Sequence, residues 1–306
     1  MKALATRPAA AQALDLVDAV VYGDVFDCAV TLDEVWRYSR RRIGREELRE
    51  RLSEDPRVGA VVCERAGLYC LAGREQLVER RAAAEERALR LQRRAHRVAR
   101  FLRHAPFVRG LLLTGSAAAG AARPGADVDL LVIVEDGRLS VVFALLGPLS
   151  RLASRRLFCP NHYLSTAHLE LGRRDLYVAR ELVQARPLAG RGADLLAAND
   201  WVRALLPNAE ASGESLPAGG RLQRALELPL RGRRGDRLER RLRRLALSRL
   251  AAHHRHWDRD LPTEAVRRLE AGAELRFHGE PATQSALRRY EERRAAVADV
   301  LAAQPT

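Results

Sequence analysis

The sequence of 306 residues predicts an α/β fold with additional structure at both ends. Residues 106–190 alternate β-rich runs with helical segments, which is typical of a layered α/β core. Residues 1–73 contain short helical segments followed by a hairpin pattern, and residues 191–306 are helical in pattern. Residues 74–105 would connect the first two parts as one long charged helix.

The N-terminal part begins with AQALDLVDAVVYGDVF, in which apolar residues recur at helical spacing. Thr31 is followed three residues later by Glu34, and this capping-box pattern predicts that a second helix begins there. Gly44 precedes a third helical segment, REELRERLSED. The run VGAVVCERAGLYCLAG then predicts two strands joined by a tight turn.

Three helices followed by a hairpin resemble a winged helix-turn-helix domain. In that arrangement the segment after Gly44 would be the recognition helix, and Arg45 and Arg49 would contact DNA. Arg65 would lie on the wing. Winged helices also serve as dimerisation or docking modules, so DNA binding and protein contact both remain open for this part.

The formal net charge is +14, which would attract phosphates, DNA, RNA or another anionic surface. Lys2 is the only lysine, however, whereas arginine and alanine are abundant throughout. Such a bias in composition also produces a basic surface with no dedicated partner. The charge alone therefore does not decide between a nucleic-acid partner and an ordinary solvated surface.

Neither a membrane nor a secreted location is indicated by the sequence. It contains no apolar run of the roughly 18 residues that a membrane span requires, and the N-terminus lacks a signal-peptide pattern. The four cysteines form no CxxC pair, which argues against a zinc site and favours reduced thiols. We therefore expect a cytoplasmic protein with no membrane partner.

Within the core, Pro106 ends the connecting helix and strand LLLTGS follows. Further expected elements are strand DVDLLVIV, a helix over residues 138–155, strand LFCPNHYLS and a helix around residues 175–184. From residue 193 onward the pattern is helical, with a looser segment near residues 207–220.

The stretch LLLTGSAAAGAARPGADVDLLVIV, residues 111–134, carries the chemistry. A buried strand ends in the turn Gly115–Ser116, and the small residues that follow let a helix begin with its amide groups facing the turn, which suits a phosphate. Strand side chains alternate, so Asp127 and Asp129 would point to the same side. Two neighbouring carboxylates are costly without a cation, and Mg²⁺ would offset their repulsion.

Gly-Ser, ten intervening residues and Asp-x-Asp resemble the signature of the nucleotidyltransferase superfamily, which includes DNA polymerase beta, aminoglycoside nucleotidyltransferases and the MNT-type proteins. The resemblance implies an α+β core with a mixed sheet. It further implies that Gly115 and Ser116 bind the phosphates of a nucleoside triphosphate such as ATP, and that Asp127 and Asp129 bind Mg²⁺ or Mn²⁺. A hydroxyl-bearing acceptor would then receive the nucleoside monophosphate, and pyrophosphate would leave.

One departure concerns the third carboxylate that the superfamily carries on a later strand. The corresponding strand, LFCPNHYLS, has no acid, and Asn161 or His162 stands there instead. Asn161 could offer an oxygen to the metal, and Glu181 on the next helix could act as the base. Without the acid, an alternative is a winged-helix DNA-binding or regulatory protein whose nucleotidyltransferase domain senses nucleotide or is inactive.

Overall fold

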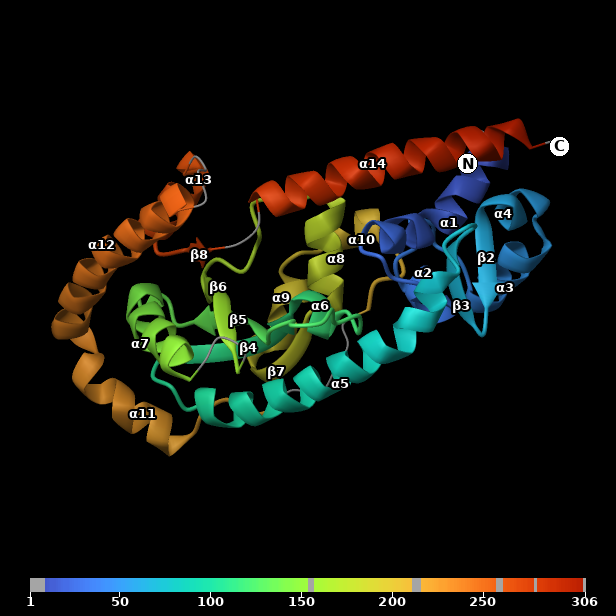
Figure 1. Ribbon diagram of the computed structural model, residues 1–306. Helices are drawn as coiled ribbons and strands as arrows, with labels where there is room; N and C mark the ends of the chain where they lie inside the picture. Colours follow the sequence, from blue (N-terminus) through green and yellow to red (C-terminus); the bar gives the residue numbers. More distant parts are fainter. Residues whose placement is uncertain (1–8, 154–156, 211–215, 257–260, 278–279, 305–306) are drawn as a thin grey trace, which may run out of the picture.

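The computed structural model describes residues 9–153, 157–210, 216–256, 261–277 and 280–304. The end of the expected helix at 138–155 and the centre of the expected looser segment at 207–220 lie outside the described residues. A central sheet lies between a small N-terminal domain and a group of C-terminal helices, and two long helices run from the core to the N-terminal domain (Figure 1).

The central sheet has five strands in the order β7-β4-β5-β6-β8. Strands β5 and β6 are parallel and the other neighbours are antiparallel, so the sheet is mixed, as expected. The strands are β4 (Val108–Thr114), β5 (Asp129–Val134), β6 (Cys159–Ser165), β7 (Arg186–Gly190) and β8 (Glu274–Arg276). Strands β7 and β8 were not foreseen, and β8 comes from the C-terminal region that the sequence analysis expected to be helical.

Each face of the sheet carries a separate layer of helices. Leu111, Leu113 and Leu130 pack against α5 (Gln76–Leu102), α7 (Leu139–Leu152) and α12 (Gly232–His256). Leu112 and Leu131 face the opposite side, where α8 (Leu176–Gln184) and the N-terminal domain lie. Because side chains alternate along a strand, Asp129 shares the face of Leu131 and points toward α8.

The N-terminal domain consists of four helices and a three-stranded antiparallel sheet in the order β1-β3-β2. Its elements are α1 (Ala9–Val25), β1 (Val30–Thr31), α2 (Leu32–Arg37), α3 (Arg45–Glu54), α4 (Pro56–Val61), β2 (Val62–Arg65) and β3 (Leu68–Leu71). The capping box of Thr31 and Glu34 is present. A winged-helix role for this domain stays a prediction.

The expected hairpin is shorter than its sequence pattern. Residues 56–61 form helix α4 and not the start of a strand, because Asp55 caps the helix by accepting a hydrogen bond from the Arg57 amide and Pro56 occupies its first turn. The turn between β2 and β3 falls at Ala66 and Gly67, both with positive φ, which matches the twist of a two-residue hairpin.

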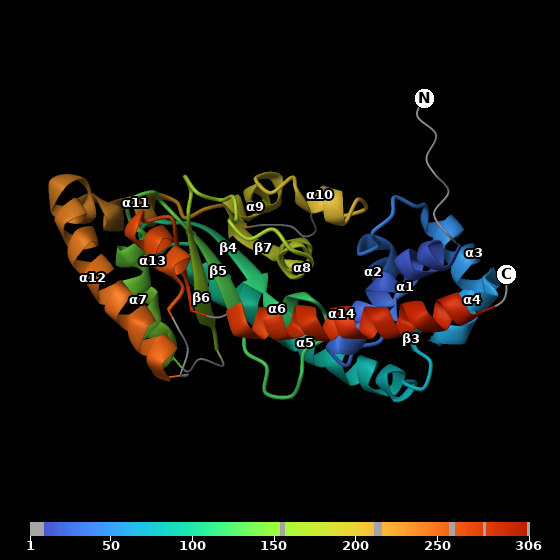
Figure 2. The same ribbon diagram turned by 90° about the horizontal axis from the view of Figure 1, so that it is seen from above.

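The remaining elements are mostly helical. They are α6 (Gly115–Ala118), the 3₁₀ segments Arg191–Ala193 and Leu228–Leu230, α9 (Asp194–Ala197), α10 (Val202–Leu205), α11 (Arg221–Glu227), α13 (Thr263–Glu270) and α14 (Glu280–Ala303). Seen from above, α12 and α13 lie at the end of the molecule farthest from the N-terminal domain, and α14 runs from beside the central sheet along the N-terminal domain (Figure 2). Among the described residues, no helix is long and apolar enough to span a membrane.

Helix α14 packs along α1, which joins the two ends of the chain. Asp18 on α1 is fully buried, and Arg294 of α14 donates to its carboxylate at 2.8 Å. Tyr290 donates a second hydrogen bond to the same oxygen, and Arg294 also lies 3.5 Å from Asp15. A buried carboxylate is tolerated only with such partners, so α14 is needed to keep α1 stable in the folded chain.

We expect Arg294→Met to lower the free energy of unfolding by about 3 kcal/mol, because it removes the cation that pairs with the fully buried carboxylate of Asp18. Urea unfolding followed by circular dichroism measures the effect. Arg51→Ala is the control, since Arg51 forms an exposed pair with Glu47 and its loss should cost less than about 0.5 kcal/mol. Equal effects of the two variants would contradict the role of α14.

Candidate active site

The Gly-Ser turn lies where β4 ends and the short helix α6 begins. Gly115 has φ of +68°, a left-handed conformation that favours glycine. A Cβ atom at this position would lie 2.7 Å from the Oδ2 atom of Asp129. Glycine is therefore required both by the backbone conformation and by the close approach of the carboxylate. Ser116 follows in the first turn of α6 and is half-buried.

Asp129 reaches the turn because β4 and β5 are antiparallel. Their register places Thr114, the last residue of β4, opposite Asp129, the first residue of β5. Asp127 precedes the strand in an extended segment whose middle residue, Val128, is fully buried. The Val128 carbonyl accepts a hydrogen bond of 2.7 Å from the Cys159 amide, which ties this segment to β6. Both aspartates are half-buried.

Asp129 lies in a strongly acidic environment. Burial, followed by the negative charges of Asp127 and Glu181, raises the pKa of Asp129 to about 7. Asp127 forms no hydrogen bond or ion pair with any residue in the part of the chain that the structure describes. The fold therefore holds carboxylates together at a cost that a cation would offset.

Asn161 contacts this carboxylate from the neighbouring strand. Leu130 pairs with Pro160 and Leu131 with His162, so Asn161 is the extra residue of a β-bulge. Its side-chain amide donates a hydrogen bond of 2.8 Å to the Oδ1 atom of Asp129. The NH₂ group, and not the amide oxygen, thus faces the carboxylate. This geometry makes Asn161 a residue that positions Asp129.

A cavity of about 230 Å³, here called the core cavity, opens beside the turn. Gly115, Asp129, Asn161 and Glu181 contribute to its walls. Its remaining lining is Thr114, Leu131, His162, Leu171, Tyr177, Leu182, Ala185, Leu195 and Arg276. Four of the six candidate site residues of the core thus lie around one hollow, although they come from two strands, a turn and a helix, whereas Ser116 and Asp127 do not line it.

Two further polar pairs border the core cavity. Glu181 of α8 accepts a hydrogen bond of 2.8 Å from Arg276 of β8. His162 lies 2.8 Å from Glu274, and that hydrogen bond together with nearby arginines counters the effect of burial and lowers the pKa of Glu274 to about 2. Both His162 and Glu181 therefore line the core cavity, and each is held by one polar partner.

The donor set fits a divalent cation that shares its ligands with a substrate. Within the described ranges, no three His, Cys, Asp or Glu side chains gather as a complete metal site. Asp127 lies close enough for its charge to act on Asp129, and no positive side chain contributes to the raised pKa of Asp129. Mg²⁺ is commonly held by one or two carboxylates together with water and substrate phosphates, and this pair has that composition.

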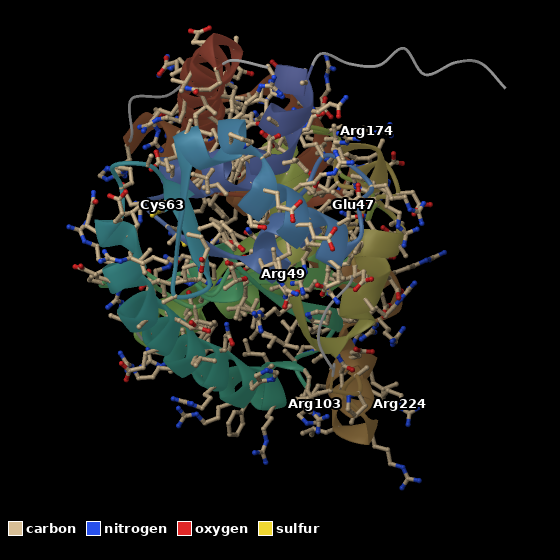
Figure 3. All side chains as sticks on the ribbon, turned by 90° about the vertical axis from the view of Figure 1, so that its right-hand side faces the viewer. Glu47, Arg49, Cys63, Arg103, Arg174 and Arg224 are labelled. Atoms are coloured by element: carbon tan, nitrogen blue, oxygen red, sulfur yellow. The ribbon has the colours of Figure 1, made fainter. Side chains whose placement is uncertain are left out.

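Arg45 and Arg49, the candidate DNA contacts, lie on α3 and do not line the core cavity. Figure 3 looks at the end of the molecule formed by the N-terminal domain, where Arg49 and Glu47 are labelled on α3. Arg45 pairs with Asp33 at 3.1 Å, and Arg49 pairs with Glu46 at 2.5 Å. Local acids thus balance the charge of this helix, and DNA binding by it stays a prediction.

The sequence analysis missed Arg276 and Arg180 at the site. Arg276 lies on β8, whose three residues are too short for a recognisable strand pattern, so no sequence signal identified it. Arg180 had a signal that was overlooked. It occupies the buried stripe of α8 between Leu176 and Val183, and an arginine at a buried helical position indicates a specific role.

We expect Asp129→Asn to raise the free energy of unfolding of the ligand-free protein by about 4 kcal/mol at pH 8, which corresponds to a pKa raised from 3.8 to about 7. A raised pKa means that the folded protein holds the proton more tightly than the unfolded chain. Stability is therefore lost as the pH rises from about 4 to about 7, and the asparagine removes that loss. Urea unfolding at several pH values measures the difference.

The stability gain of Asp129→Asn should vanish at a pH about one unit or more below 3.8, where the carboxyl is protonated in both states. Asp200→Asn is the control, because this carboxylate is highly exposed and pairs only loosely with Arg203. A gain that did not depend on pH would mean that the acidic environment of Asp129 is not its cause.

The chain was compared with known proteins at the level of families, single proteins and structures. A family model described as "Nucleotidyltransferase domain" matches residues 96–184, which contain the Gly-Ser turn, both aspartates, Asn161 and Glu181. No curated protein and no solved structure gives a significant match. The matched range covers β4, β5, β6 and α8, the elements that surround the core cavity. This chain therefore contains a nucleotidyltransferase domain.

Proposed function

We propose that the protein transfers a nucleoside monophosphate from a nucleoside triphosphate to a hydroxyl-bearing acceptor, with Mg²⁺ or Mn²⁺ bound by Asp127 and Asp129. The nucleotidyltransferase domain supports a transferase that uses a nucleoside triphosphate. The observation that carries the proposal is the close approach of Gly115 and Asp129, which line the same cavity, because it would allow phosphates at the turn to share a metal ion with the carboxylate.

In the proposed reaction, the acceptor oxygen attacks the α-phosphorus and the bond from that phosphorus to the β-phosphate oxygen breaks. The acceptor hydroxyl loses its proton, and pyrophosphate leaves. Backbone amide groups of the Gly115–Ser116 turn would hold the phosphates in line with the acceptor. The metal ion would neutralise phosphate charge and lower the pKa of the acceptor hydroxyl. Asn161 would keep Asp129 oriented through its hydrogen bond of 2.8 Å.

Glu181 is the proposed general base. It lines the core cavity, and its charge acts on Asp129. Its ion pair with Arg276, at 2.8 Å, orients the carboxylate toward the cavity that both residues line. This arrangement would supply, from a helix, the third carboxylate that strand β6 lacks.

The alternative of a DNA-binding or regulatory protein rests on the N-terminal domain. Arg45 and Arg49 are paired with acids, and α3 also carries Glu47, Glu50 and Glu54. A helix with this balance of charge gains little from the release of counterions on DNA. The acidic cavity next to the Gly-Ser turn therefore favours the enzyme.

Asp127→Asn and Asp129→Asn should each reduce nucleotidyl transfer at least about 100-fold, because each removes a charged ligand of the metal. The assay measures pyrophosphate release from the four ribonucleoside triphosphates with Mg²⁺ or Mn²⁺ and a panel of sugars, nucleosides and hydroxyl amino acids. Asp200→Asn is the control on an exposed carboxylate. Transfer that survives in both site variants would contradict the assignment of the metal ligands.

Glu181→Gln should lower kcat about 100-fold or more while nucleotide affinity changes only a few-fold, since it removes a proton acceptor and keeps the side-chain shape. Glu170→Gln is the matched control, because Glu170 forms an exposed pair with Arg174 away from the core cavity. An unchanged kcat in Glu181→Gln would exclude it as the base.

A further inference from the structure

A second cavity of about 280 Å³ lies on the other side of the Gly-Ser turn, and we call it the interdomain cavity. Tyr22, Phe26 and Tyr38 of the N-terminal domain form part of its wall. Ser116 and Arg180 line it from the core. The N-terminal residues lie outside the matched range 96–184, so this cavity depends on a part of the chain that the family match does not cover.

Arg180 differs from the other charged side chains of this cavity because it is the most deeply buried of them. It is only 2% exposed, and its guanidinium lies 3.9 Å from the ring centre of Tyr22 and 4.8 Å from that of Tyr38. Its Nε and Nη2 atoms are buried and have no hydrogen-bond partner within the described residues. Buried donors without partners are costly, and a ligand with several acceptor oxygens would satisfy them.

The other ionised side chains of the interdomain cavity have partners. Arg81 donates to Glu34 at 2.9 Å, and Arg123 lies 3.8 Å from a carboxylate oxygen of Asp27. Glu181 is paired with Arg276. Among the described residues that line this cavity, Arg180 is therefore the one charge without an opposite charge beside it. The cavity carries an excess positive charge and suits an anion.

The two cavities meet at the catalytic elements. Gly115, Tyr177 and Glu181 line both of them, whereas Ser116 lines only the interdomain cavity and Asp129 only the core cavity. A ligand bound across the turn would thus place one end beside Arg180 and another beside the aspartates. A linear polyphosphate has this form, because successive phosphate groups can contact both sides of a turn.

We propose that the interdomain cavity binds the terminal phosphates of the nucleoside triphosphate, and that Arg180 holds them through charge-assisted hydrogen bonds. The proposal deepens the proposed function and rests on it for the identity of the donor. The N-terminal domain then has a direct part in the active site. Tyr22 and Tyr38 fix the guanidinium plane, which presents its donors to phosphate oxygens with little loss of side-chain freedom.

The test measures binding of inorganic tripolyphosphate and of a nucleoside monophosphate to the full chain by isothermal titration calorimetry without metal. Arg180→Gln should weaken tripolyphosphate binding about 10- to 100-fold, which is the loss expected for one charge-assisted contact. Binding of the monophosphate should change less than about 3-fold. Arg138→Gln is the matched control, because Arg138 also lies over an aromatic ring, Phe107, with a buried unpaired Nε, but lines neither cavity.

A second variant, Ala121→Leu, keeps the proposal testable if Arg180→Gln does not fold. Ala121 lines the interdomain cavity, and leucine would occupy its space without removing Arg180. It should also weaken tripolyphosphate binding. Unchanged tripolyphosphate affinity in the folded variants, or no binding by the wild type, would overturn the proposal.

The outcomes separate this proposal from the proposed function. Tripolyphosphate binding that depends on Arg180, in a protein without transferase activity, would support the anion site and remove the proposed reaction. Transfer that needs Asp127 and Asp129 but is accompanied by unchanged tripolyphosphate binding in Arg180→Gln would retain the reaction and remove the anion site. An equal loss of monophosphate and tripolyphosphate binding would also overturn the role of Arg180 as a contact for the terminal phosphates.

Discussion

The antiparallel pairing of β4 with β5 determines the position of every group at the candidate site. It places Thr114 opposite Asp129, so a turn that leaves one strand meets the carboxylate that begins the next. The distance is so short that only glycine fits at position 115. Both cavities open on either side of this contact, and the parallel strand β6 adds Asn161 to it. A shift of one residue in the register would turn Asp129 to the opposite face of the sheet.

The charge around the candidate site differs in sign from the net charge of the protein. The chain carries a net charge of +14, yet Asp127, Asp129 and Glu181 share one region in which burial and mutual repulsion raise the pKa of Asp129. Arg180, which lines the interdomain cavity, is buried, and its Nε and Nη2 atoms have no hydrogen-bond partner in the described part of the chain. Adjacent regions of opposite charge suit a ligand that carries both a cation and phosphates. A ligand of this kind would offset the electrostatic free energy that the protein loses by burying these charges.

The sequence was most informative where the relevant residues are close together. Gly115, Ser116, Asp127 and Asp129 fall within one strand, turn and strand, so their types and spacing could be interpreted without a structure. The mixed sheet followed from the resemblance that these residues carry. The partners that arrive from distant segments could not be predicted, because no local pattern records them. Arg276 contacts Glu181 from β8. Tyr22 contacts Arg180 from α1, which is separated from α8 in the sequence by the connecting helix and most of the core.

Helix α14 has a consequence for the order in which the chain acquires its structure. Proteins are made from the N-terminus, and their domains generally fold in that order. Here the first helix carries Asp18 and Asp24, whose cationic partners include Arg294 and Arg293 near the end of the chain. The N-terminal domain therefore remains incomplete until α14 has been synthesised. A chain truncated before α14 would expose the apolar surface of α1 that packs against this helix.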